Sequence, residues 1–300
     1  MAYISVMWAE LNARLEKGDV RAIARSISLV ENDVEGARAF MMKLPRGNGR
    51  ILGITGPPGA GKSTLTDALI GEFVAAGKKV AVICVDPSSP FHKGAVLGDR
   101  IRMSDWYNHD KVFIRSLATR GAMGGLHTHI IEITDILNAA GYEEIIIETV
   151  GVGQSEVDIA SMADLTIVVL VPESGDDVQT MKSGLMEVAD VFVINKSDRP
   201  GADHIFKNLR AFAAELPGDK TAIPVIKTIA TKKEGLKELV SALDSLDRHA
   251  NEDRKAGLKA ERVFHLIQKD RMKGISKEKI KADIIAGGNS FNPYTYIAST

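Results

Sequence analysis

The feature that most constrains this chain is the glycine-rich stretch GPPGAGKS, residues 56–63, which lies between an apolar run and a helical segment. The run ILGITG ahead of it is typical of a buried strand, and residues 61–76 carry the apolar spacing of a helix. Glycines at such a junction let several backbone N–H groups converge on one point, where the helix adds the positive end of its dipole. The stretch therefore predicts an anion-binding turn between a strand and a helix.

From about residue 50 onward, short runs of branched apolar residues alternate with helical segments. Nearly continuous apolar strands joined by helices indicate an α/β fold with a mostly parallel central sheet flanked by helices. Ligands of such sheets bind beyond the carboxyl ends of the strands. The strands are expected in ILGITG, KVAVICVD, VFIRSLA, EIIIETV, DLTIVVLVP, DVFVINKSD and PVIKTIA, and the helices over 61–76, 125–140, 176–188, 201–215 and 234–249.

Both ends of the chain are predicted to be helical extensions of this core. Residues 5–44 contain two or three short helices, and Asn32 with Glu35 has the spacing of a capping box that opens the last of them. Residues 250–287 are charged and helical, while the final stretch GGNSFNPYTYIAST is expected to be extended. An apolar stripe on the C-terminal helices is expected from Val263, Phe264, Leu266 and Ile267.

The balance of charges argues against nucleic acid or a membrane as a partner. With 38 Lys and Arg against 39 Asp and Glu, the net charge is -1. The excess of positive charge expected of a dedicated nucleic-acid or anionic-membrane binder is therefore missing. No apolar run approaches the roughly 18 residues that a membrane-spanning helix needs. The single cysteine, Cys84, lies in a predicted strand, which suits a reducing cytosol. We therefore expect a soluble, cytoplasmic protein.

The glycine-rich stretch is a full match to G-x-x-x-x-G-K-[ST], the phosphate-binding loop or P-loop. Lys62 is placed to reach the β- and γ-phosphates of a nucleotide, and Ser63 to offer its hydroxyl to Mg²⁺. The expected nucleotide-binding residues here are Gly56, Pro57, Pro58, Gly59, Ala60, Gly61, Lys62, Ser63 and Thr64.

A second motif, NKSD at residues 195–198, indicates which base is bound. Asn195, Lys196 and Asp198 form the N-K-x-D arrangement of P-loop GTPases at the end of a predicted strand. The Asp198 carboxylate can accept hydrogen bonds from the ring N–H and the exocyclic amine of guanine, whereas adenine would leave it unpaired. The expected nucleotides are therefore GTP and GDP rather than ATP.

The stretch IIIETVGVGQSE, residues 145–156, allows three interpretations: a metal-side or water-side carboxylate, half of a dinucleotide fingerprint, or a tight turn. The dinucleotide interpretation fails because G-x-G-x-x-G lacks its third glycine here and the phosphates already have a loop. Glu148 ends a strand expected beside the P-loop, where nucleotide hydrolases place an acidic residue near Mg²⁺. Glu148 and Gly151 then form E-x-x-G, in which Gly151 would donate its N–H to the γ-phosphate.

Two further carboxylates are expected near the cation. Asp86 closes the strand VAVICVD, and Asp99 lies in the long segment PSSPFHKGAVLGDRIRM. A connection of that length is more often functional than idle, so we expect it to order around Mg²⁺ and the γ-phosphate. For Asp99, the alternative is a solvated loop acid or a helix cap. The predicted metal set is Ser63, Asp86, Asp99 and Glu148, and the predicted catalytic set is Lys62, Asp86, Asp99, Glu148 and Gly151.

Hydrolysis is expected to be slow in the isolated protein. Val152 follows Gly151 where related hydrolases carry the glutamine that orients the attacking water. A partner or a second copy would then complete the site. Arg100, Arg102 and Arg120 are unassigned basic candidates, for each of which the alternative is a surface ion pair.

Taken in order along the chain, five stretches resemble the MeaB/ArgK-type P-loop GTPases, the methylmalonyl-CoA mutase-associated GTPases related to the human methylmalonic aciduria type A protein. They are GPPGAGKSTL, VDPSSPFHKGAVLGDRIRM, RGAMGGL, ETVGVGQSE and VINKSD, and the resemblance covers roughly residues 5–298. It implies a GTP-hydrolysing chaperone that gates adenosylcobalamin loading and protects a cobalamin-dependent acyl-CoA mutase such as methylmalonyl-CoA mutase.

The resemblance also implies particular residues and an assembly. The loop that contacts the guanine O6 is usually a Ser-Ala pair, and Ile229 and Ala230 stand there in this chain. Residues 172–182 match an additional switch that communicates with the mutase. The implied assembly is a homodimer. The expected divisions are an N-terminal helical extension over 1–46, a P-loop GTPase domain over 47–250 and a C-terminal helical dimerisation arm over 251–300.

Three other functions remain open. A nickel-inserting metallochaperone GTPase shares the fold class, but His127 and His129 are two residues apart on a predicted helix and would point away from each other. A transport-associated ATPase or kinase conflicts with the guanine motif. A nucleotide-gated scaffold without useful turnover is the third alternative.

Overall fold

The computed structural model describes residues 2–86, 103–118, 126–149, 155–175, 186–215, 223–249 and 252–299. The chain forms two compact units, Met1–Glu261 and Arg262–Thr300. No helix among the described residues is long and apolar enough to cross a membrane.

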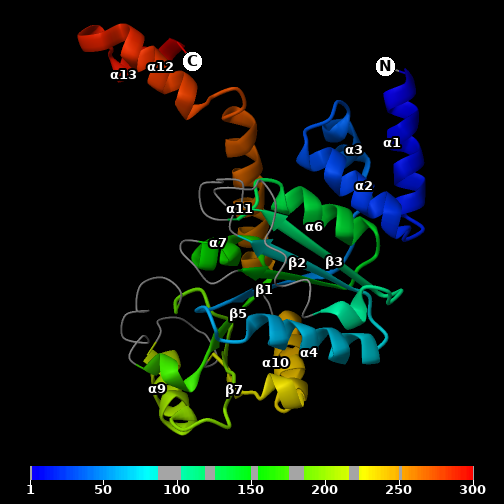
Figure 1. Cartoon of the computed structure of the whole chain (residues 1–300), viewed down its shortest axis with the longest axis vertical. Helices are drawn as coiled ribbons and strands as arrows, with labels where there is room; N and C mark the ends of the chain where they lie inside the picture. Colours follow the sequence, from blue (N-terminus) through cyan, green and yellow to red (C-terminus); the bar gives the residue numbers. More distant parts are fainter. Residues whose placement is uncertain are drawn as a thin grey trace. The chain divides into compact units, whose positions relative to one another are not determined.

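A single parallel sheet lies at the centre of the larger unit (Figure 1). Its strand order among the described residues is β3-β2-β4-β1-β5-β6-β7, which places β1 between β4 and β5. The strand bounds confirm the seven predicted strands: β1 (Arg50–Thr55), β2 (Val80–Asp86), β3 (Val112–Ala118), β4 (Glu144–Thr149), β5 (Leu165–Leu170), β6 (Val191–Ile194) and β7 (Val225–Lys227).

Helices cover both faces of the sheet, as the apolar strands predict. Four of the expected helices are present, and the expected helix over 176–188 falls mostly outside the described residues. Among the described residues, the α-helices that lie wholly in the larger unit are α1 (Ala2–Leu15), α2 (Val20–Glu31), α3 (Ala37–Lys43), α4 (Lys62–Ala75), α6 (Ile130–Ala139), α7 (Ser155–Met162), α9 (Ala202–Glu215) and α10 (Leu236–His249). The short 3-10 turns are η1 (Ser104–Trp106), η2 (Pro172–Gly175) and η3 (Ala230–Lys232).

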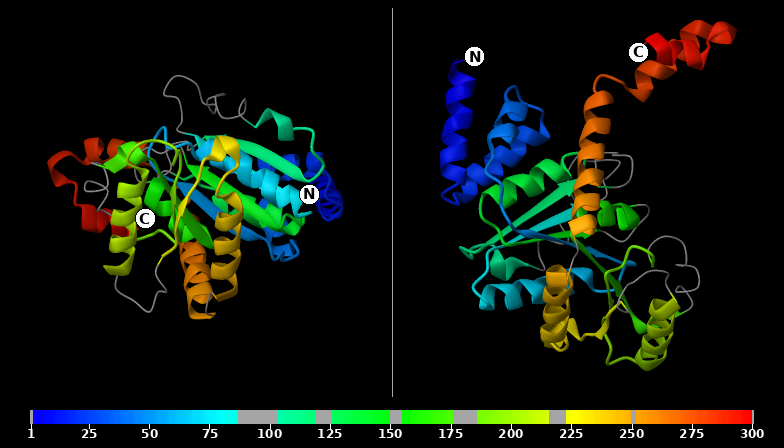
Figure 2. Two further views of the ribbon diagram at one scale, coloured as in Figure 1. Left: turned by 90° about the horizontal axis from the view of Figure 1, so that it is seen from below. Right: turned by 180° about the vertical axis from the view of Figure 1, so that it is seen from behind.

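The alternation of side chains along each strand assigns the helices to their faces. Leu52 and Ile54 of β1 join the apolar cluster formed with α4 and α10. Phe192 and Ile194 of β6 belong to a separate cluster with α9. The views in Figures 1 and 2 place α4 and α6 on opposite sides of the strands. Gly53 faces α7 closely enough that a Cβ there would lie 2.6 Å from a side-chain atom of Ile159.

The N-terminal helices form a small bundle in which the predicted capping box is wrong. α3 begins after Gly36, whose φ of 89° places it in the left-handed region, and Gly36 packs against the indole of Trp8. Asn32 instead ends α2, and its side chain donates to the carbonyl of Ser28 at 2.6 Å. The capping-box prediction fails because a residue far away in the chain fixes this turn. The Nε1 of Trp8 donates to the Glu35 carbonyl at 2.9 Å.

A buried carboxylate attaches this bundle to the sheet. Glu31, the last residue of α2, forms an ion pair with Arg115 of β3, and its Oε1 lies 3.3 Å from His127 Nε2. Arg115 also donates to the carbonyl of Ala24 at 3.2 Å. Burial raises the pKa of Glu31, but the hydrogen bond from His127 and the charge of Arg115 outweigh it, so the pKa lies below its ordinary value of 4.5.

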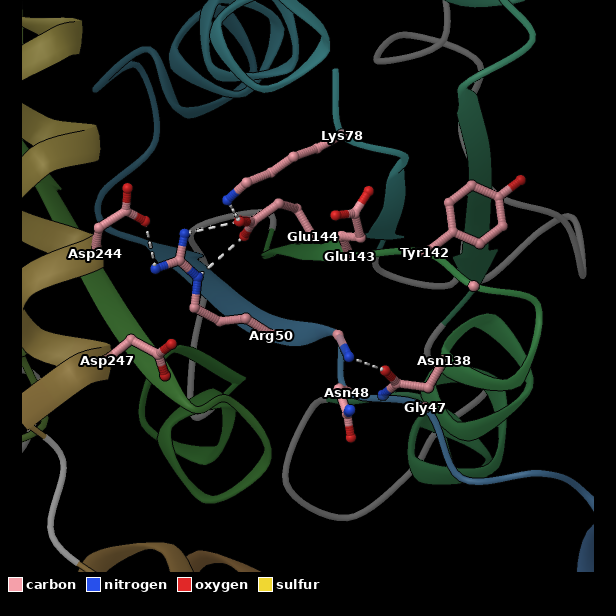
Figure 3. Close-up of a pocket in the computed structure, with 12 residues that line it drawn as sticks. Gly47, Asn48, Arg50, Lys78, Asn138, Tyr142, Glu143, Glu144, Asp244 and Asp247 are labelled. Carbon is pink, nitrogen blue, oxygen red and sulfur yellow. Dashed lines mark hydrogen bonds and ion pairs between the residues drawn. The ribbon is translucent and has the colours of Figure 1, made fainter. Parts of the chain in front are cut away.

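A second buried charge cluster closes the amino-terminal edge of the sheet (Figure 3). Arg50 of β1 and Glu144 of β4 are 8% and 2% exposed and form a bidentate pair at 3.0 and 2.8 Å. Lys78 approaches Glu144 at 2.6 Å, and Asp244 of α10 approaches Arg50 at 3.1 Å. These groups line a cavity of about 360 Å³, where burial raises the pKa of Tyr142 to about 12.

The smaller unit ends in helices up to Ser299, the last described residue, so the expectation of an extended tail is wrong. α11 (Glu252–Arg271) crosses into it and is followed by α12 (Lys277–Gly287), η4 (Gly288–Ser290) and α13 (Pro293–Ser299). Asn292 opens α13 by accepting from the backbone N–H groups of Tyr294 and Thr295. Tyr296 donates to Asp283 of α12 at 2.8 Å, which secures the last turn. The expected domain boundaries near residues 46 and 250 stay a prediction.

Replacing Glu144 by alanine should be strongly destabilising, because it leaves Arg50 buried without its bidentate partner. Breaking such a buried pair costs about 3–5 kcal/mol. The matched control is Glu173→Ala, since Glu173 and Arg199 form an exposed pair, and exposed ion pairs contribute little to stability. Denaturant unfolding of both variants measures the difference, and equal losses of stability would contradict the assignment.

The buried Glu31 carboxylate, with Arg115 and His127, should make the stabilisation that it provides decrease at acidic pH. Because the folded pKa of Glu31 is depressed, its contribution is present above the ordinary value of 4.5 and is lost as the pH falls through the folded pKa. The difference in unfolding free energy between the wild type and Glu31→Gln should therefore shrink between pH 5 and pH 3. Denaturant unfolding at both pH values tests this, and a difference that does not change would contradict it.

Candidate functional site

The P-loop turns from β1 into α4 at the carboxyl edge of the sheet. Gly56 has a φ of 138°, and a Cβ there would lie 2.1 Å from the carbonyl oxygen of Val169 in β5. Gly61, with a φ of 87°, immediately precedes α4. At Gly56 the positive φ and the close backbone contact both exclude a side chain, and at Gly61 the left-handed backbone and the nearby Asn195 amide both disfavour one. The turn therefore has the geometry that the sequence predicts.

The Lys62 ammonium folds back over this turn. Lys62 is the first residue of α4, is buried, and donates to the carbonyl oxygens of Gly56 at 2.8 Å and Pro57 at 3.2 Å. The positive charge and the amino end of α4 therefore face the same turn, an arrangement that can bind phosphate. Thr64 lies in the first turn of the same helix.

Glu148 contacts the same helix from the neighbouring strand. β4 pairs with β1, with Ile54 opposite Glu148, so the expectation that this strand lies beside the P-loop is confirmed. Ser63 Oγ donates to Glu148 Oε1 at 2.5 Å, and Thr66 Oγ1 donates to Oε2 at 2.9 Å. Thr66 was not predicted as a site residue, although its place one helical turn after Ser63 was a usable signal.

Asn195 links the P-loop to the base-recognition loops. Its side-chain amide donates to the Ala60 carbonyl at 3.0 Å, and its Oδ1 accepts from Thr228 Oγ1 at 3.2 Å and the Ala230 N–H at 3.1 Å. Lys196 reaches in the same direction and donates to the Gly59 carbonyl at 2.8 Å. The predicted residues of NKSD and the Ile229-Ala230 turn are thus brought together beside the phosphate loop.

The exposed end of this motif is linked to η2 by an ion pair. Asp198 is exposed, and the next residue, Arg199, pairs with Glu173 at 2.5 Å. The hydrogen bond from Arg199 holds the pKa of the Glu173 carboxyl below its usual range. Glu173 lies in η2, at the beginning of the predicted switch over 172–182.

Part of the predicted site lies outside the described residues. This holds for Asp99, Gly151, Val152, the switch residues 176–182 and the basic candidates Arg100, Arg102 and Arg120. Asp86 is described as the last residue of β2, opposite Ala118 of β3.

The donor set beside Lys62 suits a hard divalent cation. Ser63 and Glu148 present a hydroxyl and a carboxylate oxygen at the start of α4, and oxygen donors are the ligands that Mg²⁺ prefers. Because the Ser63 hydroxyl donates its proton to Glu148, its oxygen would act toward a metal as an electron-pair donor. These two residues could therefore hold the cation that accompanies the phosphates.

The histidines that bear on the nickel alternative are not on a helix. α6 begins at Ile130, so His127 and His129 lie in the turn before it, with ring centroids 5.8 Å apart. The expectation that they point away from each other on a helix is wrong. His127 contacts Glu31 and His129 contacts Asp33. No cluster of three or more His, Cys, Asp or Glu with a metal-binding arrangement occurs in the parts of the chain that the structure describes.

A P-loop with its lysine and serine, an adjacent acidic strand end and an N-K-x-D motif joined to the P-loop define a P-loop GTPase. The family model described as "Methylmalonyl Co-A mutase-associated GTPase MeaB" matches residues 23–289. The chain belongs to this family. It hydrolyses GTP to GDP and phosphate.

Comparisons with individual proteins agree with this assignment. A putative GTPase of Pyrococcus abyssi is 48% identical over 288 residues, which cover 93% of this chain and 88% of that protein. The fused isobutyryl-CoA mutase of Geobacillus kaustophilus is 36% identical over 280 residues, covering 85% of this chain but 25% of the mutase. The crystal structure of an LAO/AO transport system kinase matches 98% of this chain and 96% of its own, with a TM-score of 0.70 and 26% identity.

A side chain at Gly61 should abolish the contact between Asn195 and the P-loop. A Cβ there would lie 2.4 Å from Asn195 Nδ2, whereas Gly77 has the same φ of 87° and nothing within 4 Å of its Cβ position. In both alanine variants the free energy of unfolding should fall by about 1–2 kcal/mol, because alanine is strained in the left-handed region. Only Gly61→Ala should also lower GDP affinity, by about 10²-fold, because it displaces the groups that orient the nucleotide.

Calorimetric GDP titration and thermal unfolding of the Gly61→Ala and Gly77→Ala variants separate these two effects. An unchanged GDP affinity in Gly61→Ala would show that the contact with Asn195 does not matter for binding.

Proposed function

We propose that this protein is a GTP-driven chaperone of a cobalamin-dependent acyl-CoA mutase, which gates adenosylcobalamin loading and protects the mutase. The observation that carries the proposal is the fused isobutyryl-CoA mutase, which contains a segment 36% identical to 280 residues of this chain. A GTPase that is covalently attached to a mutase in one protein is a natural partner of a separate mutase in another. The family description, mutase-associated GTPase, supports the same partner class.

The nucleotide would bind along the carboxyl edge of the sheet. Lys62 and the P-loop N–H groups would hold the β- and γ-phosphates. At the other end, Asp198 would accept from the guanine ring N–H and amine, and the Ile229-Ala230 turn would face O6. In the described geometry the Ala230 N–H donates to Asn195, so contact with O6 would require that bond to be shared or exchanged.

The cation would be held by Ser63, with Glu148, Asp86 and Asp99 as the acidic residues around it. When bound, Mg²⁺ neutralises charge on the phosphates and their oxygens during transfer. Ser63 fits this role because its proton is already donated to Glu148 at 2.5 Å. Gly151 would donate its N–H to the γ-phosphate.

The protein would act as a homodimer through its C-terminal unit. Val263, Phe264 and Ile267 of α11 are each more than half exposed, as are Ile285 of α12 and Ile297 of α13. Exposed apolar side chains that are neighbours on one helix, as the three on α11 are, can mark a surface that another chain covers. The predicted stripe on these helices is therefore available for the dimer that the family resemblance implies.

A transport-associated kinase is the second candidate, because the solved structure that covers 98% of this chain carries that name. The two functions differ in their product. A chaperone GTPase releases inorganic phosphate, whereas a kinase transfers the phosphoryl group to an acceptor protein. The exposed Asp198 beside the P-loop favours guanine nucleotides and therefore the first candidate.

Hydrolysis should be slow in the isolated protein and faster with a mutase. With valine in place of a water-orienting glutamine, we expect on the order of 10⁻⁴ to 10⁻² s⁻¹ alone, values typical of incomplete GTPase sites. Addition of a cobalamin-dependent acyl-CoA mutase should raise this at least about tenfold, and by no more than the roughly 10⁵ that completion of such a site can add. Phosphate release, measured with and without the mutase, checks both expectations.

Complex formation provides the matching binding test. Size-exclusion chromatography with the mutase should show a complex whose amount differs between GDP and a non-hydrolysable GTP analogue, and Lys62→Ala should lose that difference. Turnover of tens per second by the protein alone would contradict the slow-hydrolysis proposal. No complex in either nucleotide state would contradict the chaperone proposal, and labelling of a transport protein with γ-phosphate would favour the kinase.

A further inference from the structure

Thr66 makes a contact that neither the P-loop motif nor the guanine motif requires. It lies in α4, one turn after Ser63, and is fully buried. Its Oγ1 donates to Glu148 Oε2 at 2.9 Å while Ser63 Oγ donates to Oε1 at 2.5 Å. The two oxygens of one carboxylate are therefore each held by a hydroxyl of the same helix face.

The surroundings of Glu148 make this second contact important. In the sheet, Glu148 lies between Ile54 of β1 and Cys84 of β2, and both neighbours belong to the apolar cluster that packs under α4. Glu148 itself is 4% exposed. A carboxylate at the edge of such a layer needs hydrogen-bond donors, because an ionised group without them is costly to bury.

The two hydroxyls differ in what they can do once a nucleotide is bound. Ser63 is the first residue after Lys62 and can face both Glu148 and the cation. Thr66 lies deeper in the helix, with no exposed surface, and faces the carboxylate alone among the contacts described for it. Its hydrogen bond holds Oε2, which restricts rotation of the carboxylate and keeps Oε1 where the Ser63 hydroxyl donates its proton.

We propose that Thr66 is a positioning residue for the divalent cation, acting through Glu148 and Ser63. The inference rests on the proposed role of Ser63 and Glu148 at the cation, and it adds the residue that orders them. A threonine that only stabilised the fold would change the melting temperature but not the dependence of nucleotide binding on Mg²⁺.

The experiment measures release of a fluorescent GDP analogue as Mg²⁺ is raised from zero, in the presence of EDTA at the zero point. Thr66→Val keeps the volume and removes the hydroxyl, and Thr66→Ser restores the hydroxyl. Thr134→Val is the matched control, because Thr134 is also a buried threonine with a hydroxyl bond, to the Ile131 carbonyl in α6. Thermal unfolding reports the folding of each variant.

The half-maximal Mg²⁺ concentration should rise about tenfold in Thr66→Val, the effect expected when a hydrogen bond to a charged group is lost. It should equal the wild-type value in Thr66→Ser and Thr134→Val. The release rate in EDTA should be the same in all four proteins, since the phosphate loop is unchanged. If Thr66→Val does not fold, Thr66→Ala removes the same hydroxyl without adding volume and should show the same rise.

An unchanged half-maximal concentration in Thr66→Val would overturn the inference. A faster release of the GDP analogue from Thr66→Val in EDTA, by the same factor as in Mg²⁺, would also overturn it. Thr66 would then act on the phosphate loop rather than on the cation. A Ser63→Ala variant separates this inference from the function on which it rests. If Ser63→Ala shifts the Mg²⁺ dependence and Thr66→Val does not, only the role of Thr66 fails; if neither shifts it, the proposed cation site itself is wrong.

Discussion

The side-chain amide of Asn195 is the interaction on which the nucleotide site depends. Its nitrogen holds the P-loop through Ala60, and its oxygen holds the turn at Thr228 and Ala230. Three segments that are far apart in the chain are thereby fixed against one buried group. The close approach of Gly61 to the same amide shows how little space this arrangement leaves. If the P-loop binds the phosphates and NKSD the base, as proposed, the two functions would be coupled through Asn195 and through Lys196, which donates to the Gly59 carbonyl.

The sheet order explains why these groups can meet. Because β1 lies between β4 and β5, the P-loop has the acidic end of β4 on one side and the strands that lead to NKSD on the other. All of these strands are parallel, so their carboxyl ends share one edge. The opposite edge is closed by Arg50, Glu144 and Lys78 (Figure 3), whose charges satisfy one another. The sheet therefore has an amino-terminal edge whose charged side chains pair with one another, and a carboxyl edge whose polar groups can face a ligand.

Much of the fold could be predicted, because strand periodicity and the P-loop are local signals. All seven strands, the place of Glu148 beside the P-loop and the proximity of NKSD followed from them. The errors arose where distant contacts decide local structure. Trp8 sets the turn that Asn32 was expected to cap, and Asp283 secures a tail whose polar sequence looked extended. Thr66 escaped notice for a related reason: a buried threonine in this helix has the same pattern as a core residue, and its spacing from Ser63 gains meaning once the register of β4 places Glu148 beside it.

The two tryptophans of the chain occupy different parts of the structure, and each has a fixed hydrogen-bond partner. Trp8 donates to the Glu35 carbonyl within the N-terminal bundle and stacks near Phe40. Trp106 donates to Asp67 at 2.7 Å, next to Thr66, and packs over Gly71 of α4. The chain therefore carries two natural optical reporters, one of its appended helices and one of the helix that follows the phosphate loop. Substituting either indole would let the emission of the other follow a single region without any added label.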